Sequence, residues 1–311
     1  MIHVLPLPGF MRRMHCYMQE MYPLALRIPL AAVIGSTAVL FTRFVLGAVP
    51  GEPLPAVTLC SAAVFLNLLL LRLMDELKDV DIDRALFRDR PLPSGRVREH
   101  DIRWSMAVTA AAYLGAHVLY PLSLLTAVPL LGYTWLMYRY FFIPGVLREN
   151  LFLNLATHNP VIPLIFLHCA FTTVVVSGAA HAALQWSLLA PGVLMLWSVM
   201  FAWEIARKIR APRDENAYVT YSQLLGRGGA VALAFGAQTL GAGLFTVFVF
   251  TAGWTPLALL PMAAAYAGLG TIYTRYLMYP VTARARLLRP AAELYAVAMM
   301  LSVIAACGGL S

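Results

Sequence analysis

The chain is 311 residues long, 60% hydrophobic and only 12% charged, with a formal net charge of +8 at pH 7. A water-soluble domain of this size cannot bury so much apolar surface, so the composition predicts a polytopic membrane protein. The basic residues are spread over several connections and form no nucleic-acid-binding motif. We therefore do not expect nucleic acid as a partner.

Nine hydrophobic segments are long enough to cross a bilayer. In chain order they lie near 23–47, 54–74, 104–120, 122–141, 152–177, 187–206, 229–251, 254–275 and 289–309. Breaks at Tyr120-Pro121 and near Gly253 predict two tight helical hairpins, and Pro160 and Pro163 predict that the fifth helix is bent. We expect an all-α protein with one transmembrane domain over 1–311, in which about nine helices surround a central pocket.

Lysine and arginine predict the orientation of these helices. If the N-terminus is cytosolic, all of the 23 Lys and Arg residues except Arg43 fall in the N-terminal segment, in cytosolic connections or at cytosolic helix ends. This distribution follows the positive-inside rule and suits an anionic inner leaflet. Residues 1–22 lack the apolar core and cleavage site of a signal peptide, and we expect them to lie at the membrane surface. The charged connections 75–103 and 207–228 are predicted to be cytosolic and to carry the active site.

The most informative stretch is 75–96, DELKDVDIDRALFRDRPLPSGR, which holds six acids and five bases between almost uncharged segments. On a helix, Asp75, Asp79 and Asp83 lie roughly on one face, with Glu76 beside them. Like charges this close repel, so we expect a cation to bind there. Carboxylate oxygens suit Mg²⁺, which keeps several waters and bridges to substrate phosphates. A solvated loop of mixed charge is the alternative, but the ordered spacing favours a site.

This stretch resembles the first aspartate-rich motif of the UbiA superfamily of intramembrane prenyltransferases. The family pattern is N-D-x-x-D-x-x-x-D, followed by a turn similar to N-R-P-L-x-S-G. The chain has Asp75-Glu76-x-x-Asp79-x-x-x-Asp83 and then the turn RPLPSGR over 90–96. Asp75 stands where the family has Asn, and Glu76 stands where it has Asp. Both replacements keep oxygen atoms that can bind a metal.

A second resemblance lies at the end of the fourth segment. The chain here contains Tyr133, Tyr138-Arg139-Tyr140 and Pro144, which are similar to the family pattern Y-x-x-x-K-R-Y/F-T-x-x-P. Tyr138 stands at the position of the family's lysine, while Arg139 keeps its arginine. An arginine at a membrane boundary can bind a diphosphate through a bidentate fork, or it can simply anchor the helix end.

The region after the sixth segment departs from the family's second aspartate-rich motif. Glu204 stands at the first Asp of that motif, the position four residues later is Lys208, and acids return only at Asp214 and Glu215. An acid at the membrane edge of an apolar helix is costly and usually functional. The surrounding bases could replace part of the charge of a second Mg²⁺, bind an anionic group on the other substrate, or anchor the loop to the inner leaflet.

The resemblance implies a Mg²⁺-dependent enzyme that ionises an isoprenyl diphosphate and transfers the prenyl group to a small aromatic or otherwise hydrophobic acceptor. Terpene cyclisation, which needs the same site and no acceptor, remains an alternative. Transfer of a phosphoribosyl-type group to a lipid phosphate is a further one. A transporter is the alternative from another class, but it needs ionisable residues near the membrane midplane, where this chain has almost none.

The resemblance and the polar residues near the three regions predict the site. The residues expected to take part in catalysis are Asp79, Asp83, Arg139 and Glu204. The expected metal ligands are Asp75, Glu76, Asp79, Asp83, Glu204, Asp214 and Glu215. The residues expected to contact substrate are Asn67, Arg72, Lys78, Arg90, Tyr133, Tyr138, Tyr140, His158, Asn159, Arg207, Lys208 and Arg210. Among these, Asn67, His158 and Asn159 lie inside apolar segments, where hydrogen bonding between helices is the alternative role.

Overall fold

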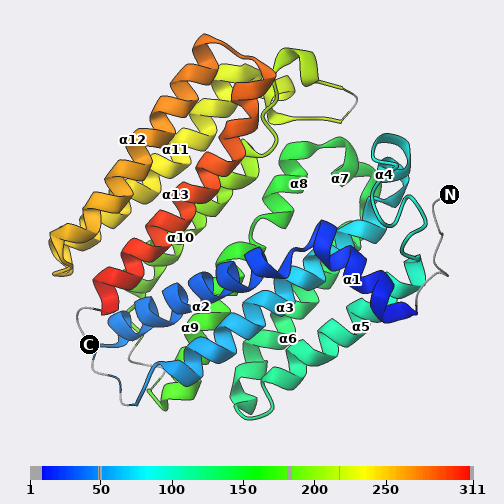
Figure 1. The fold of residues 1–311 in the computed structure, drawn as a ribbon. Helices are drawn as coiled ribbons and strands as arrows, with labels where there is room; N and C mark the ends of the chain where they lie inside the picture. Colours follow the sequence, from blue (N-terminus) through cyan, green and yellow to red (C-terminus); the bar gives the residue numbers. More distant parts are fainter. Residues whose placement is uncertain (1–8, 48, 50, 181–183, 217, 309–311) are drawn as a thin grey trace.

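A computed structural model describes residues 9–47, 49, 51–180, 184–216 and 218–308. These residues form helices and connections and no β-strand (Figure 1). The predicted ranges 1–22, 207–228 and 289–309 therefore lie partly outside the described residues. In chain order the α-helices are α1 (Phe10–Met21), α2 (Leu24–Leu46), α3 (Leu54–Lys78), α4 (Val80–Leu86), α5 (Glu99–Ala116), α6 (Leu124–Tyr138), α7 (Pro144–Glu149), α8 (Leu151–His158), α9 (Val161–Ser177), α10 (Trp186–Ala206), α11 (Tyr221–Thr251), α12 (Leu259–Met278) and α13 (Thr282–Gly308). Short 3-10 turns are η1 (Pro121–Ser123), η2 (Tyr140–Phe142), η4 (Pro212–Asp214) and η5 (Pro256–Ala258).

The architecture is that of a polytopic, all-helical membrane protein. Within the described residues, seven helical segments are long and apolar enough to cross a membrane: Leu24–Leu46, Leu54–Lys78, Leu151–Ser177, Trp186–Ala206, Tyr221–Thr251, Pro256–Met278 and Thr282–Gly308. The expected count of nine is not confirmed. The third and fourth expected segments do form the helical hairpin α5–α6, but α6 has only 15 residues and the first turn of α5 carries two acids, Glu99 and Asp101.

The fifth expected span is bent, as the prolines predict. It consists of α8 and α9, which are separated at Asn159 and Pro160. Pro160 has no amide hydrogen to donate, so the helix is interrupted there and restarts at Val161. The break leaves His158 as the last residue of α8 and Asn159 directly after it. Helix α8 lies on the same side of the bundle as α4 and α7 (Figure 1).

Small residues allow the helices of the bundle to pack closely. α2 packs along α3, α10 along α11, and α12 along α13. Helix α13 also packs against α2 and α10. A Cβ atom added at Gly35 of α2 would lie 2.7 Å from the backbone nitrogen and 2.8 Å from the Cα of Ser61 in α3. Small residues at such crossings permit the close backbone approach that stabilises membrane helices.

Arg43 is the one base that departs from the positive-inside pattern, and the structure gives it a local role. Its Nη2 donates hydrogen bonds to the carbonyl oxygens of Val49 at 3.2 Å and Gly51 at 2.8 Å. These carbonyls belong to the connection between α2 and α3. Arg43 therefore satisfies backbone acceptors that the apolar helices on either side cannot reach.

The N-terminal helix α1 packs against the bundle beside α3 and α5. Tyr17 and Met14 form a buried cluster with Leu73 of α3 and Ile102 of α5. Arg13 of α1 adds a bidentate ion pair to the buried Asp101, with distances of 2.6 and 2.7 Å. The membrane-surface location of this segment stays a prediction.

The contact between Gly35 and Ser61 predicts the result of one substitution. We expect Gly35→Ala to destabilise the protein by about 1–3 kcal/mol, because the added methyl group meets backbone atoms that cannot rotate away. Thermal unfolding in detergent, followed by size-exclusion fluorescence, measures the change. Gly132→Ala is the matched control, since a Cβ there meets nothing within 4 Å. If both variants unfold at the same temperature, the α2–α3 crossing does not depend on a glycine.

Candidate functional site

Asp75 and Asp79 lie where the apolar helix α3 ends. α3 ends at Lys78, and Asp79 links it to α4, which begins at Val80. The Asp75 side chain is exposed and that of Asp79 is half-buried. Within the described residues, neither carboxylate lies within 4.0 Å of a basic nitrogen, although both carry charge at the end of a spanning helix. These two acids therefore remain available to a ligand.

The other two acids of the motif already have basic partners. Glu76 is buried and forms an ion pair with Arg72 one turn earlier on α3. Asp83 is buried on α4 and accepts two hydrogen bonds from Nη1 of Arg90, both at 2.7 Å. Arg72 and Arg90 thus neutralise acids of the motif in this structure.

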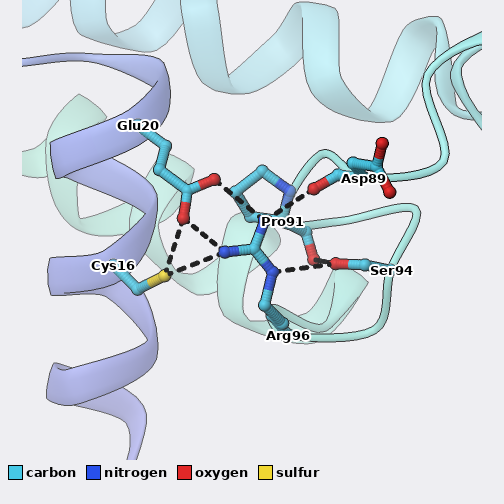
Figure 2. Close-up of polar contacts among 6 residues, drawn as sticks. All are labelled: Cys16, Glu20, Asp89, Pro91, Ser94 and Arg96. Carbon is cyan, nitrogen blue, oxygen red and sulfur yellow. Dashed lines mark hydrogen bonds and ion pairs between the residues drawn. The ribbon is translucent and has the colours of Figure 1, made fainter.

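The turn RPLPSGR over 90–96 is anchored to α1 (Figure 2). Arg96 forms an ion pair with Glu20 of α1, and its Nη2 donates to the carbonyl oxygen of Asp89 at 2.6 Å. Its Nε donates to Ser94 Oγ at 3.1 Å. Gly95 adopts φ +77°, a left-handed conformation that glycine accommodates without strain. The turn therefore connects the N-terminal helix with the acidic motif.

A strained turn brings Tyr140 beside the first motif. Tyr140, Phe141 and Phe142 have φ values of 50°, 50° and 61°, which non-glycine residues rarely adopt. The buried Tyr140 directs its hydroxyl toward Asp79 Oδ1 at 3.5 Å, and its ring lies 4.0 Å from Lys78 Nζ. Burial, with the nearby Asp79 charge, raises the pKa of Tyr140, so its hydroxyl stays protonated. Strain of this kind is typical of functional sites.

Lys78 forms a second contact with the end of α8. Its Nζ lies 2.8 Å from Nε2 of His158, whose Nδ1 lies 2.9 Å from the carbonyl oxygen of Asn154. Since an ammonium group can only donate, Nε2 accepts, and Nδ1 carries the proton that Asn154 accepts. His158 is therefore a neutral imidazole that positions Lys78.

The end of α10 supplies the opposite side of the site. Glu204 pairs with Arg207 at 2.5 Å and with Lys208 at 3.3 Å. The charges of Arg207 and Glu204 act on the Asp75 carboxyl, and Lys208 acts on Asp79. The ends of α3 and α10, about 130 residues apart in the chain, thus share one electrostatic environment.

Asp79 shows the effect of this environment most clearly. Burial, together with the neighbouring charge of Asp75, raises its pKa from the ordinary 3.8 to about 6. The bases Lys78 and Lys208 oppose this shift but do not cancel it. A cation bound at the two carboxylates would stabilise the charged form.

The remaining acids expected as metal ligands lie in other contacts. Asp214 Oδ1 accepts from Thr282 at 3.0 Å, and its carbonyl oxygen accepts from Arg210 at 3.4 Å. Glu215 accepts from Thr220 at 2.8 Å and from Ser222 at 2.5 Å, beside the capping box that starts α11. In this structure these acids organise the loop between α10 and α11.

Three other expected residues form hydrogen bonds between helices. Asn67 donates to Thr134 at 3.2 Å, and Tyr133 donates to the carbonyl oxygen of Thr157 at 2.7 Å. Asn159 accepts from Trp197, which links α8 to α10. For Asn67 and Asn159, these are the interhelical hydrogen bonds that the sequence analysis gave as the alternative role. Tyr138 is half-buried at the end of α6.

Of the two arginines near Tyr140, Arg148 lies beside its ring, whereas Arg139 lies beside Phe142. The exposed Arg139 lies 5.9 Å from the ring of Phe142. Arg148 of α7, which the sequence reading did not select, lies 4.9 Å from the ring of Tyr140, and its charge acts on Lys78. Arg148 belongs to none of the three motifs, so only the fold shows that it lies beside Tyr140.

The seven expected metal ligands do not form one cluster. Among the described residues, no group of three or more His, Cys, Asp or Glu side chains is placed to hold a metal by itself. The other five expected ligands are held in ion pairs or in hydrogen bonds of the loop after α10, which leaves the pair Asp75 and Asp79. Mg²⁺ is commonly bound through one or two carboxylates, with waters and substrate phosphates completing its shell. The donor set therefore fits a metal that arrives with an anionic substrate.

The raised pKa of Asp79 predicts a pH-dependent effect on stability. Because the folded pKa lies above the ordinary value, ionised Asp79 lowers the free energy of unfolding above about pH 6, and this penalty fades as the pH falls through 6. In metal-free buffer, Asp79→Asn should therefore unfold at a higher temperature than the parent at pH 8. The difference should shrink at pH 5. A variant that is less stable than the parent at pH 8 would contradict this electrostatic account.

Comparison with known proteins bears on the fold. A scan against protein-family models finds no match, and a search of curated proteins finds none either. Among solved structures, the chain is similar to the apo structure of a UbiA homolog from Aeropyrum pernix K1, with a TM-score of 0.61 and 18% identity over 86% of this chain and 97% of that one. It is also similar to a digeranylgeranylglyceryl phosphate synthase, with a TM-score of 0.60 and 14% identity over 95% of this chain and 99% of that one.

These similarities cover nearly the whole of each chain at low sequence identity. They therefore concern the fold, and residue roles do not follow from them. The resemblance noted from three short motifs is thus confirmed at the level of architecture: the chain has the fold of a UbiA homolog.

Proposed function

We propose that this protein is a UbiA-type enzyme that ionises an isoprenyl diphosphate and transfers the prenyl group to a hydrophobic acceptor. The observation that carries the proposal is the placement of two carboxylates without ion pairs, Asp75 and Asp79. The charges of Lys78 and of the bases that follow α10, Arg207 and Lys208, act on them. An anionic substrate bound through a cation fits this arrangement, because the acids hold the cation and the bases face the remaining negative charge. The fold shared with UbiA-type proteins supports the same reading.

Mg²⁺ is the proposed metal, with Asp75 and Asp79 as its protein ligands. When bound, it would stabilise the negative charge that develops on the leaving diphosphate. Glu76 and Asp83 have a different proposed role. Their pairs with Arg72 and Arg90 keep the end of α3 and the following turn in place. Asp83, expected to be catalytic, is therefore proposed here as a positioning residue.

The bases around the acids are proposed to bind the diphosphate oxygens. These bases are Lys78, Arg148 and Lys208, and the charges of Arg148 and Lys208 both act on Lys78. Arg207 and Lys208 are held by Glu204, which keeps both at the end of α10. Convergent cations of this kind stabilise a leaving group only if they are held in position before the reaction. The paired Glu204 supplies that positioning.

The allylic carbon–oxygen bond breaks as the diphosphate leaves, and a carbocation remains on the prenyl chain. It requires a site from which water is excluded, and a helix bundle in a membrane supplies one. Aromatic faces stabilise such a cation, and the site contains Tyr140 with Phe141 and Tyr133 close to it. An acceptor nucleophile then forms the new bond and loses a proton to solvent or to the site.

The first test is turnover with purified protein, Mg²⁺ and a panel of isoprenyl diphosphates of increasing chain length. Diphosphate release and mass spectrometry of the extracted products are measured with and without aromatic acceptors. We expect acceptor-dependent release. Cyclic hydrocarbon without acceptor would identify a terpene cyclase instead, and no Mg²⁺-dependent reaction or binding would refute the proposed function.

Asp79→Ala tests the proposed metal ligand. We expect turnover to fall by roughly a hundredfold or more, since the charge that holds the cation is lost. The matched control is Asp81→Ala, two residues along the chain, whose side chain is 90% exposed. Equal activity in both variants would exclude Asp79 as a ligand.

Arg148→Gln tests the base that the fold identified. Loss of a charged contact to diphosphate costs about 1.5–3 kcal/mol, so the concentration of isoprenyl diphosphate needed for half-maximal rate should rise roughly tenfold or more. The acceptor concentration needed for half-maximal rate should change little. Arg286→Gln, at an exposed position on α13, serves as the control. A change in the acceptor dependence alone would place Arg148 at the other substrate.

A further inference from the structure

A second polar cluster lies inside the bundle, away from the candidate active site. Tyr113 is on α5 and His117 directly follows that helix, four positions later, while His168 and Thr172 lie four residues apart on α9. Residues at this spacing share a helix face. All four side chains are at most 2% exposed. The imidazole centroids are 5.0 Å apart, and the Tyr113 ring lies 5.4 Å from His117 and 6.0 Å from His168.

The cluster is at the opposite end of α5 from the acidic motif. α5 starts at Glu99, just after the turn that holds Arg90, and ends at Ala116. With a rise of about 1.5 Å per residue, its ends are roughly 25 Å apart. His117 therefore belongs to neither the diphosphate site nor its metal.

Hydrogen bonds fix the tautomer of His117. Its Nδ1 lies 2.7 Å from Oγ of Ser123, and this hydroxyl donates its own hydrogen to the carbonyl oxygen of Tyr120 at 2.6 Å. Oγ must then accept from Nδ1–H of the imidazole. The Nε2 atom of His117 is left with a free lone pair.

The same logic applies to His168. Its Nδ1 lies 2.9 Å from Oγ1 of Thr126, and that hydroxyl donates to the carbonyl oxygen of Ser123 at 3.2 Å. His168 is therefore also a neutral imidazole with its proton on Nδ1. Histidines that bind a metal through Nε2 usually have their Nδ1–H held by an acceptor in this way.

Four buried polar atoms of the cluster have no hydrogen-bond partner among the described residues. They are Nε2 of His117, Nε2 of His168, the hydroxyl of Tyr113 and Oγ1 of Thr172. A buried polar atom without a partner costs about 1–3 kcal/mol, so four of them in one place indicate a bound group. Because each neutral imidazole offers a lone pair on Nε2, the bound group must be one that accepts electron pairs, such as a metal ion.

We propose that this cluster binds one first-row transition-metal ion through Nε2 of His117, Nε2 of His168 and the oxygen of Tyr113. Since metal–imidazole nitrogen bonds are about 2.0–2.1 Å long, two imidazoles on one tetrahedral ion place their ring centroids about 5 Å apart. The observed 5.0 Å agrees with that geometry. No three His, Cys, Asp or Glu side chains converge in the described part of the chain. Tyr113 is assigned as the third protein ligand because its buried hydroxyl has no partner among the described residues and its ring lies beside both imidazoles.

A divalent ion bound to the Tyr113 oxygen polarises the O–H bond and stabilises the phenolate, so the phenolic proton is released and the set gains one anionic ligand. The proton goes to solvent, and no electron is transferred. A water molecule completes the four-coordinate shell, and Thr172 Oγ1 can hydrogen-bond to that water. Imidazole and phenolate ligands suit Zn²⁺, Co²⁺ and Cu²⁺, and they do not suit Mg²⁺. This site thus differs in its chemistry from the one proposed at Asp75 and Asp79.

Zn²⁺ and Co²⁺ are the probes for this site. The tag-free full-length protein in detergent is equilibrated with Zn²⁺ and desalted, and bound zinc is counted by mass spectrometry. We expect one equivalent, and Co²⁺ should give the intense visible d–d bands of tetrahedral coordination. Tyr113→Phe keeps the ring but removes the ligand oxygen, and it should weaken Zn²⁺ binding at least tenfold. His168→Gln should abolish the cobalt spectrum.

Two control variants separate this site from others. His100→Gln removes an exposed histidine of α5 and should leave zinc binding unchanged, as should Asp79→Asn at the proposed active site. No zinc retained by the parent, or the same retention in Tyr113→Phe and His168→Gln as in the parent, would overturn the proposal. In that case ordered water occupies the cluster. Prenyl transfer activity does not enter this test, so its outcome is independent of the proposed function.

Discussion

Negative charge at the end of an apolar helix is the constraint on which the site depends. Asp75 and Asp79 end a spanning helix without ion pairs, and the raised pKa of Asp79 reflects the cost. Such charge is stable at a membrane edge only when cations, fixed or bound, face it. Lys78 and the bases that follow α10 supply part of that compensation. We propose that a metal ion bound with its diphosphate substrate compensates the rest of the negative charge of Asp75 and Asp79.

The rest of the fold can be understood as the means of bringing these groups together. The break at Pro160 ends α8 at His158, where the imidazole accepts a hydrogen bond from Lys78. The left-handed turn at Tyr140 places a protonated phenol beside Asp79. At both places, the break at Pro160 and the turn at Tyr140, irregular backbone replaces regular helix. In a membrane protein this is tolerated where the irregular segment is packed within protein or lines a polar cavity.

The first motif predicted similar roles for acids that the structure treats differently. Glu76 and Asp83 are buried in ion pairs, whereas Asp75 is exposed. Helical periodicity gives only approximate directions, and here the helix breaks at Asp79, so Asp83 lies on a separate helix, α4, where it pairs with Arg90. Arg148 could not be found from a pattern, because it meets Tyr140 only through the loop that follows α6.

The sequence by itself determined the class of the protein, the order of its apolar helices, the bend at Pro160 and the charged regions that gather at one end. Composition and periodicity act locally, so they can be read along the chain. Only the tertiary structure decided which acids are neutralised, which bases face Asp75, and that Tyr113, His117 and His168 meet inside the bundle. Those outcomes depend on contacts between helices far apart in sequence, and apolar helix faces alone do not specify such contacts.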